Sequence, residues 1–355
     1  MASSTPDLSL LFPGMSHELW RRARRVRWSQ ADTVPTTLKE RCDLWCVDDN
    51  AAYRDTGFSA AEITRIASMM DGTVMPLHLL EGCRQLPDVA SLLGAALMYL
   101  RGWTSTMICG CTTHSQSYVL FCVRIGLRVL VKAAKEFGCG RYPSAAVRQM
   151  LMGSAGQEEP WRRITTRVDG MFIEVANNRM ARWGHQGKGV NCTVVTDLYG
   201  HILFFDVQSS EQHDRTVLNS VLHKFEPWLD DEVMLADNGY AYMQHPHIYA
   251  LKRPSEVDGD AAEVRLQLTA ACMGTEIIHG HMKGRWRSIV KHCRLADPLL
   301  LAEAALCLAA LKSIWRPCVA PVTRYMLAQL RSQTPAPSPA VPRTAAAHDS
   351  QLPGR

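Results

Sequence analysis

Three acidic residues stand where the sequence pattern does not require an acid for folding. Asp169 interrupts an apolar, strand-like segment just before Gly170, and Asp237 ends the apolar run VMLAD. Glu276 begins a segment in which charged residues recur at helical spacing. Carboxylates at buried strand ends repel one another or bind protons unless cations neutralise them. Oxygen ligands of this kind suit Mg²⁺ or Mn²⁺ and leave positions for water and phosphate.

The chemistry that such a cluster performs is in-line attack on a phosphodiester. Two divalent ions about 4 Å apart activate a water molecule and stabilise the leaving oxygen. The pattern alone does not single out three of the 34 acidic residues. Asp197, Asp206 and Asp214 are alternatives, and an Asp at a strand end is often only a turn or cap residue.

The segment EIIHGHMKGRWRSI, residues 276–289, predicts an amphipathic helix. At about 3.6 residues per turn, its apolar side chains form one stripe and its polar ones another. The polar stripe carries Glu276, Gly280, Lys283 and Arg287. An ordinary exposed helix face with one acid and two cations would show the same pattern.

The elements before this helix alternate between strand and helix patterns. Residues 163–175, 189–197 and 200–208 are β-rich runs separated by turn signals. A helical stretch follows at 213–228, and then a short buried strand at 233–237. Three strands in a meander, a helix and a further strand predict an α/β domain with a mixed sheet.

The region from about residue 40 to 137 has a helical pattern instead. Residues 59–70 begin with Ser59 as an N-cap and Glu62 at the capping-box position. Two further helices are predicted at 88–102 and 113–138, joined by the connection WTSTMICGCT. This arrangement fits a DNA-binding helix-turn-helix, although any small helical bundle would show it too.

A basic cluster lies near the N-terminus in the segment ELWRRARRVRW. It includes Arg21, Arg22, Arg24 and Arg25. It predicts a nuclear-import signal or an arm that contacts DNA phosphates, but a solvated helix face has the same composition. The net charge of the whole chain is only +5, so an anionic partner must be inferred from such clusters rather than from the total.

Length and composition indicate a soluble globular protein with two folding units. The 355 residues are 47% hydrophobic and 21% charged. The opening segment MASSTPDLSLLF lacks the features of a secretory signal. The most apolar run, 298–311, is short and contains an acid, so it predicts a buried helix and no membrane partner. The Pro- and Ala-rich segment 332–355 predicts disorder.

The order of several motifs resembles that of the PIF/Harbinger transposases and their domesticated nuclease relatives. The motifs are VDGMFIEV, SSEQHD, VMLADNGY and TEIIHGHMKGRWRSI, and the similarity covers roughly residues 142–295. A weaker similarity extends to residues 96–119, which look like the helix-turn-helix of that family, and to 141–150, which look like its lead-in to the catalytic domain.

This resemblance implies an RNase H-like mixed β-sheet catalytic domain with a DDE site, preceded by an all-α, helix-turn-helix-like domain. Asp169, Asp237 and Glu276 match the three metal-binding, catalytic acids, with 67 and 38 residues between them. The implied metals are two Mg²⁺ or Mn²⁺ ions. Lys188, Lys283 and Arg285 match family positions and are expected to contact DNA, and His213–Asp214 match a pair that shapes the site. Arg287, on the polar stripe of the helix, and the N-terminal arginines are expected to contact DNA as well.

The implied domains are a basic arm (1–40), a helical DNA-binding domain (41–140), the nuclease domain (141–331) and a tail (332–355). The implied setting is the nucleus, with DNA, a Myb-like partner protein and a homo-oligomer on DNA. The sequence departs from the family at Cys272, where an arginine is usual, and at Val264, Arg265 and His279. Two alternatives stay open: a domesticated protein that binds DNA or chromatin without cutting, which the departure at Cys272 favours, and an RNase H-like hydrolase acting on RNA or hybrids, which the order of the strands permits.

Overall fold

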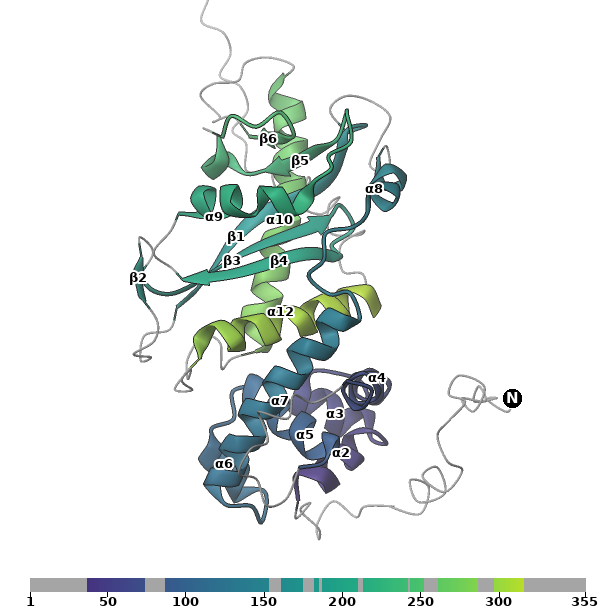
Figure 1. Cartoon of the computed structure of the whole chain (residues 1–355), viewed down its shortest axis with the longest axis vertical. Coiled ribbons are helices and arrows are strands. Elements are labelled where there is room, and N and C mark those ends of the chain that lie inside the picture. The colour runs from purple at the N-terminus through teal and green to yellow at the C-terminus, as the bar shows by residue number, and fades with distance from the viewer. Residues whose placement is uncertain are drawn as a thin grey trace, which may run out of the picture.

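The computed structural model describes residues 37–73, 87–152, 161–174, 182–184, 187–209, 213–241, 243–251, 261–286 and 297–315. Helices α2 to α7 form one end of the molecule, and a mixed sheet with its covering helices forms the other (Figure 1). The N-terminal arginines and the tail at 332–355 lie outside the described residues.

Local capping explains where the N-terminal helices begin. A Ser, Thr or Asp side chain precedes each of the helices α2 to α7 and accepts a hydrogen bond from its first turn. The predicted capping box of Ser59 and Glu62 is confirmed. The helices are α2 (Leu38–Trp45), α3 (Asp49–Thr56), α4 (Ala60–Asp71), α5 (Val89–Leu100), α6 (Ser105–Gly110), α7 (Gln116–Glu136) and α8 (Ala145–Leu151).

Two of these helices, α5 and α7, match the predicted pair, but the segment between them differs from the prediction. The stretch WTSTMICGCT was expected to be a plain connection, whereas it contains the short helix α6. Thr104 accepts a hydrogen bond from Met107 N–H and so starts this extra turn. A single Thr within an otherwise unperiodic stretch was too weak a signal to predict it.

The sheet has six strands and an order that fits the predicted fold. β1 (Ile164–Glu174) lies between β3 (Gly187–Asp197) and β5 (Val233–Ala236), and β6 (Ile248–Ala250) pairs with β5 at one edge. β4 (Ile202–Ser209) and the short β2 (Arg182–Gly184) both pair with β3. β1, β3 and β4 are antiparallel neighbours, whereas β1, β5 and β6 run parallel. An antiparallel meander extended by two parallel strands is the RNase H-like arrangement, so the predicted α/β fold class is confirmed.

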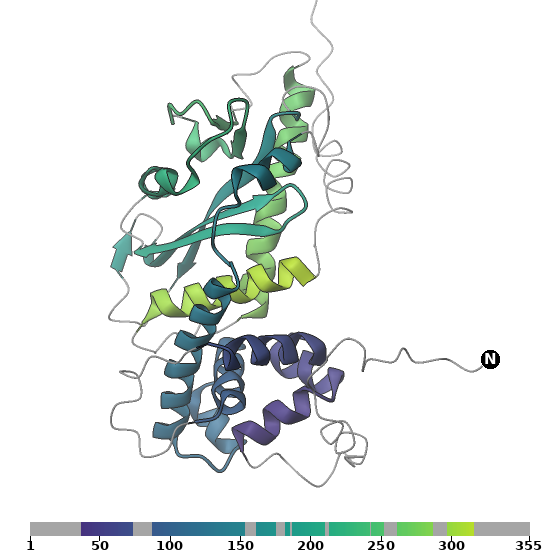
Figure 2. The same ribbon diagram turned by 45° about the vertical axis from the view of Figure 1, so that its right-hand side comes forward.

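Helices cover both faces of this sheet. α10 (Ala261–Arg285) and α12 (Pro298–Trp315) pack against one face, whereas α9 (Asp214–Val221) and the 3-10 helix η3 (Leu222–Phe225) cover the other (Figures 1 and 2). The single helix predicted at 213–228 is thus divided into α9 and η3, and it ends at Phe225, earlier than expected. Glu226 is extended, as a residue before proline prefers to be.

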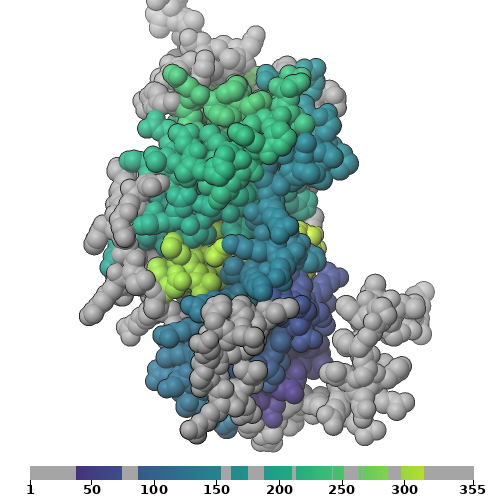
Figure 3. Space-filling view, in the orientation of Figure 1, coloured from purple at the N-terminus to yellow at the C-terminus, as the bar shows by residue number. Residues whose placement is uncertain are grey.

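The helix α12 joins the two ends of the molecule. It packs against α7 on one side and against β4 on the other, and its atoms are visible in patches between the helical part and the sheet in the space-filling view (Figure 3). It is longer than the predicted run 298–311, and by length and composition alone it could cross a membrane. Its apolar side chains are instead largely buried in the core of this fold, as the sequence predicted.

One buried cluster extends across the predicted boundary at residues 140 and 141. It contains side chains of α2 to α7, of β1, β3 and β4, and of α10 and α12. A second cluster lies under α9, and a third lies between the start of α10 and the sheet. The division into helical and nuclease domains stays a prediction, because the two parts share much of their apolar core.

Close packing of α5 against α7 gives a stability prediction. A Cβ atom at Gly126 of α7 would lie 2.3 Å from the Leu92 carbonyl oxygen of α5. We therefore expect Gly126→Ala to reduce the free energy of unfolding by ~2 kcal/mol, because the two helix backbones must separate. Urea denaturation measures this change.

Gly280→Ala in α10 is the matched control. Its added Cβ would meet nothing within 4 Å, so we expect it to stabilise the protein by about 0.5–1 kcal/mol through helix propensity. Equal effects of the two substitutions would contradict the close packing of α5 and α7.

Candidate active site

Asp169 and Asp237 lie at neighbouring positions of two parallel strands. β1 pairs with β5 so that Val168 is opposite Ala236, and each acid is the next residue of its chain segment. All four residues of β5 are buried, and Asp237 is the first partly exposed residue after them. The fold thus brings together two acids that 67 residues separate in the sequence.

The electrostatics of Asp169 show how crowded this region is. Burial raises the pKa of Asp169 to about 7, and repulsion by the carboxylates of Asp237, Glu276 and Asp214 contributes to the increase. A hydrogen bond that Gly170 N–H donates to Asp169 Oδ1, 2.8 Å long, acts in the opposite direction. Burial also raises the pKa of Asp237 and of Asp214. The four carboxylates therefore share one electrostatic environment.

Glu276 belongs to this environment through α10, which packs across the face of β1 that carries Asp169. The Glu276 side chain is exposed, whereas His279, three residues later, is buried with its Nδ1 3.5 Å from Asp169 Oδ2. Burial, together with the charge of Lys283, lowers the pKa of His279 to about 3. The imidazole is therefore neutral at physiological pH, and its contact with Asp169 is a polar contact rather than an ion pair.

Arg167 fixes the position of α10 on the sheet. It precedes Asp169 by two residues on β1, and its Nη1 donates a 2.5 Å hydrogen bond to the Ala271 carbonyl of α10. A Cβ atom at Gly274 would lie only 2.2 Å from this Nη1, so the glycine leaves the space that the guanidinium occupies. Gly274 itself precedes Glu276 by two residues. Arg167 therefore joins the two backbone segments from which Asp169 and Glu276 project.

The same guanidinium lies near Cys272, where the resembling family usually has an arginine. Burial raises the pKa of the Cys272 thiol to about 12, and Asp237 and Asp169 raise it further, whereas the charge of Arg167 lowers it. Burial lowers the pKa of Arg167 itself to about 10, so the side chain stays protonated at neutral pH. Arg167 on β1 thus places a positive charge near position 272, where this chain lacks the arginine of that family.

Asp214 is the acid that sequence reasoning left among the alternatives. It is the first residue of α9, and its carboxylate packs against Gly170, where an added Cβ would lie 2.7 Å from Oδ2. The glycine of the Asp-Gly pair therefore makes room for a fourth carboxylate. The signal in the sequence was the pair His213–Asp214, to which the resemblance gave only a role in local geometry.

The other two alternatives have structural partners. Asp197 accepts hydrogen bonds from Tyr199 N–H and His201 N–H in the turn between β3 and β4. Asp206 pairs with Lys224, with Nζ 2.8 Å from Oδ1. Asp197 is therefore a turn residue and Asp206 an ion-pair residue.

Asp237 combines a structural role with its place beside Asp169. Its Oδ1 accepts a 2.9 Å hydrogen bond from Gly239 N–H and caps the short 3-10 helix η4 (Asn238–Tyr240). The turn buries Tyr240, whose hydroxyl has no hydrogen-bond partner among the described residues. Burial and repulsion by Asp214, Asp169 and Asp237 raise the pKa of this phenol well above its usual value. Tyr240 is therefore a protonated donor near three carboxylates.

The lysines and arginines predicted to bind DNA do not lie together in the structure. Lys283 is exposed on the last turn of α10, but Arg285 turns toward the helical part, where its Nη2 donates to the Tyr53 hydroxyl at 3.4 Å. Lys188 is six residues along β3 from the partner of Asp169, which is about 20 Å at 3.3 Å per residue. The structure therefore does not bring Lys188 to the acids. Arg287 and the N-terminal arginines lie outside the described residues.

The carboxylate oxygens of these acids are suitable ligands for a hard divalent cation, but their positions in this structure do not enclose an ion. Within the described ranges, no three His, Cys, Asp or Glu side chains come close enough together to hold one. Two buried polar atoms without partners there, Tyr240 Oη and His279 Nε2, belong to residues that adjoin the acids. Oxygen donors with raised pKa values fit Mg²⁺ or Mn²⁺, because a cation relieves the repulsion that burial intensifies.

The raised pKa of Asp169 predicts how stability depends on pH. Between pH ~4 and ~7 folded Asp169 keeps a proton that the unfolded chain has released, so stability falls as the pH rises through this window. We expect Asp169→Asn to stabilise the metal-free protein by ~1–2 kcal/mol at pH 8 and to have little effect at pH 4. Denaturation curves at both pH values measure this.

Glu174→Gln, on the exposed end of the same strand, is the control. A benefit of Asp169→Asn that is the same at pH 4 and pH 8, or that Glu174→Gln reproduces, would contradict the assigned pKa of Asp169.

Comparison with known proteins agrees with this geometry over part of the chain. Residues 160–292, a little more than a third of the protein, match the family model described as "Transposase DDE domain". The matched segment contains Asp169, Asp237 and Glu276. No curated protein and no solved structure matches the chain. The match supports a place for the sheet-containing part in the DDE transposase superfamily, whose members generally use divalent metal ions to act on DNA.

Proposed function

We propose that this protein is a Harbinger-like DDE nuclease or transposase that hydrolyses DNA phosphodiester bonds. One observation carries the proposal: the segment that matches the transposase DDE domain brings Asp169 beside Asp237, and α10 crosses them with Glu276. Strand transfer by the freed 3′-hydroxyl would follow if the protein is mobile.

The roles of the acids follow from their surroundings. Asp169 and Asp237, on adjacent strands, would together with Glu276 hold two Mg²⁺ or Mn²⁺ ions. Bound metal would acidify an attacking water and stabilise the leaving oxygen. Asp214, packed against Gly170, is placed to add a fourth carboxylate to this set.

The uncharged groups around the acids support the same function. The buried imidazole of His279 is neutral, so it neither competes with a metal ion nor neutralises Asp169. The phenol of Tyr240 stays protonated and has a hydrogen to donate. Neither residue adds a positive charge that would weaken the attraction of the carboxylates for metal ions.

The DNA path and the cellular setting are further parts of the proposal. Glu276, Gly280 and Lys283 lie along one side of α10, so a backbone leaving the acids would meet Lys283 and then Arg287. Lys188 and the N-terminal arginines would contact phosphates further away, which makes binding sensitive to salt. We propose a nuclear protein that works with a Myb-like partner and as a homo-oligomer on DNA.

A second candidate function is DNA or chromatin binding without cleavage. The departure at Cys272 favours it, because a thiol can neither hold a phosphate nor orient Glu276 as an arginine would. Arg167 weakens this argument, since its guanidinium lies near Cys272 and holds α10. A third candidate, cleavage of RNA or hybrids, is compatible with the RNase H-like sheet.

Metal-dependent nicking tests the proposal. Purified full-length protein should nick a labelled DNA duplex with Mn²⁺, and Asp169→Asn and Glu276→Gln should each reduce the rate by on the order of 10²-fold or more, because each removes a metal ligand. Glu174→Gln, on the same strand as Asp169 but exposed, should cut as well as the unchanged protein.

Three other results would point elsewhere. Equal nicking by all variants would mean that another site or a contaminant cuts. Salt-sensitive DNA binding with no nicking by the unchanged protein would favour the non-cleaving function. Faster cleavage of a matched RNA or hybrid would favour the third candidate.

A further inference from the structure

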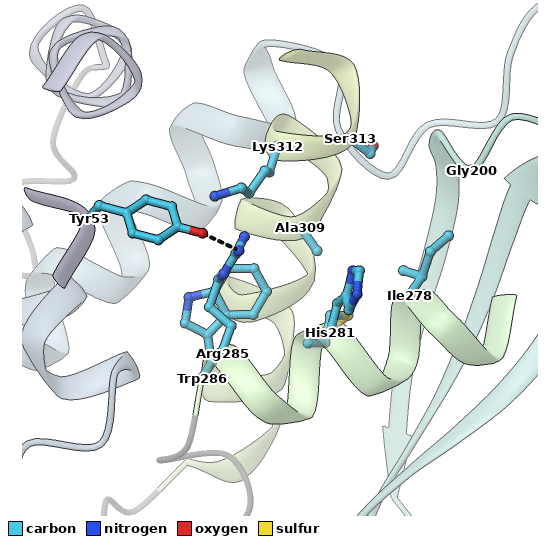
Figure 4. Close-up of a pocket in the computed structure, with 10 residues that line it drawn as sticks. Tyr53, Gly200, Ile278, His281, Arg285, Trp286, Ala309, Lys312 and Ser313 are labelled. Atoms are coloured by element: carbon cyan, nitrogen blue, oxygen red, sulfur yellow. Dashed lines mark hydrogen bonds between the residues drawn. The ribbon is translucent and has the colours of Figure 1, made fainter. Parts of the chain in front are cut away.

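A groove lies between α10 and the helical part, beyond Glu276 along α10. It consists of two hollows of about 210 and 310 Å³ that share Tyr53, His281 and Arg285 as lining residues. Tyr53 comes from α3, whereas the other two shared residues come from α10 (Figure 4). The groove is therefore built by both parts of the protein.

Three cations from three different elements line this groove. Arg285 comes from α10, Lys312 from α12, and Arg101 from the end of α5. The ring of Tyr53 has the Arg285 guanidinium 5.9 Å and the Lys312 ammonium 5.6 Å from its centre. Figure 4 shows both side chains pointing toward this ring.

The charge of the groove comes from these lining side chains, of which Arg285 donates to a neutral group and Lys312 lies near an acid. Arg101 Nη1 donates to the Arg285 carbonyl at 2.7 Å, and Arg285 donates to the Tyr53 hydroxyl, both of which are neutral groups. Lys312 donates to the Gly57 carbonyl and lies 3.9 Å from Glu62, which offsets part of its charge. A polyanion is the occupant that this charge distribution favours.

A smooth strip of α10 connects the acids to this groove. Glu276, Gly280 and Gly284 are four residues apart and so lie on one side of the helix. Gly280 and Gly284 are exposed, line the larger hollow, and have nothing within 4 Å of where a Cβ would stand. A chain of phosphates leaving the acids could therefore lie close to the helix backbone at Gly280 and Gly284.

We infer that the groove binds the phosphate backbone of the DNA strand that flanks the scissile bond. Tyr53 is half exposed, but cations lie close to its ring, so it orients Arg285 and Lys312 rather than stacking on a base. The helical part would thereby contribute to substrate binding at the catalytic domain through Tyr53 and Arg101. This inference rests on the proposed function, because DNA is taken to be the substrate.

A carboxylate placed in the groove tests the inference. Gly284→Glu puts a negative charge on the exposed strip, where an added Cβ would meet nothing within 4 Å, and Gly284→Gln is a neutral side chain of the same size. In full-length protein that also carries Asp169→Asn, so that bound DNA stays uncut, we expect Gly284→Glu to bind a labelled duplex about tenfold more weakly than Gly284→Gln. The slope of log Kd against log salt should also be shallower for Gly284→Glu.

Gly284→Lys should bind DNA more tightly than Gly284→Gln, and thermal melts of all three variants check that they fold alike. Equal affinities of the Glu, Gln and Lys variants would overturn the groove as a DNA site. The proposed function is tested separately, by metal-dependent nicking in protein with Asp169 intact. If the protein nicks DNA but the Gly284 variants bind DNA equally well, only the groove is refuted. If the Gly284 variants differ in DNA affinity but the protein does not nick DNA, only the proposed cleavage is refuted.

Discussion

The rest of the structure depends on one constraint. The fold holds several carboxylates close together where β1 and β5 lie side by side, and these carboxylates repel one another. Asp169 and Asp237 occupy neighbouring register positions, and burial gives their like charges little screening. Such an arrangement reduces stability unless a proton or a cation is present. The apolar layers on both faces of the sheet must therefore hold these strands in place against the repulsion.

Two glycines let other elements approach the carboxylates closely. Gly170 makes room for Asp214 at the start of α9, and Gly274 makes room for Arg167 under α10. Both approaches are too close for any side chain larger than hydrogen. The buried guanidinium of Arg167 also supplies positive charge beside Cys272, where the resembling family has its own arginine. A positive charge is therefore present near position 272 although the arginine usual in that family is replaced by cysteine.

The sequence predicted the features that depend on local patterns. The buried run VMLAD and the strand broken at Asp169 placed two acids at strand positions that pair in the fold. The caps and periodicity located α4, α5 and α7 and the second part of α10, whose first part, from Ala261, was not predicted. Sequence reasoning named Asp214 only as an alternative acid and as part of a pair that shapes the site, because the proximity of Asp214 to Gly170 depends on how α9 docks on the sheet. Arg167 was missed for the same reason: a buried arginine on a strand gives no sign of its partner 104 residues away. The three-residue strand β6 is too short to leave a pattern.

The shared core explains how the helical part could affect chemistry at the acids. α12 packs against both α7 and β4, and one buried apolar cluster contains side chains from α2 to α7 and from α10 and α12. Trp286, at the end of α10, is buried and stacks on Phe58 of the helical part with ring centres 6.3 Å apart, as expected for a core residue rather than a base-stacking one. Opening the groove at Tyr53 would expose this packing to water, which costs about 25 cal/mol for each Å² of apolar surface. A DNA strand bound there would consequently stand at a fixed distance from Asp169, because neither wall of the groove can move without disrupting the core.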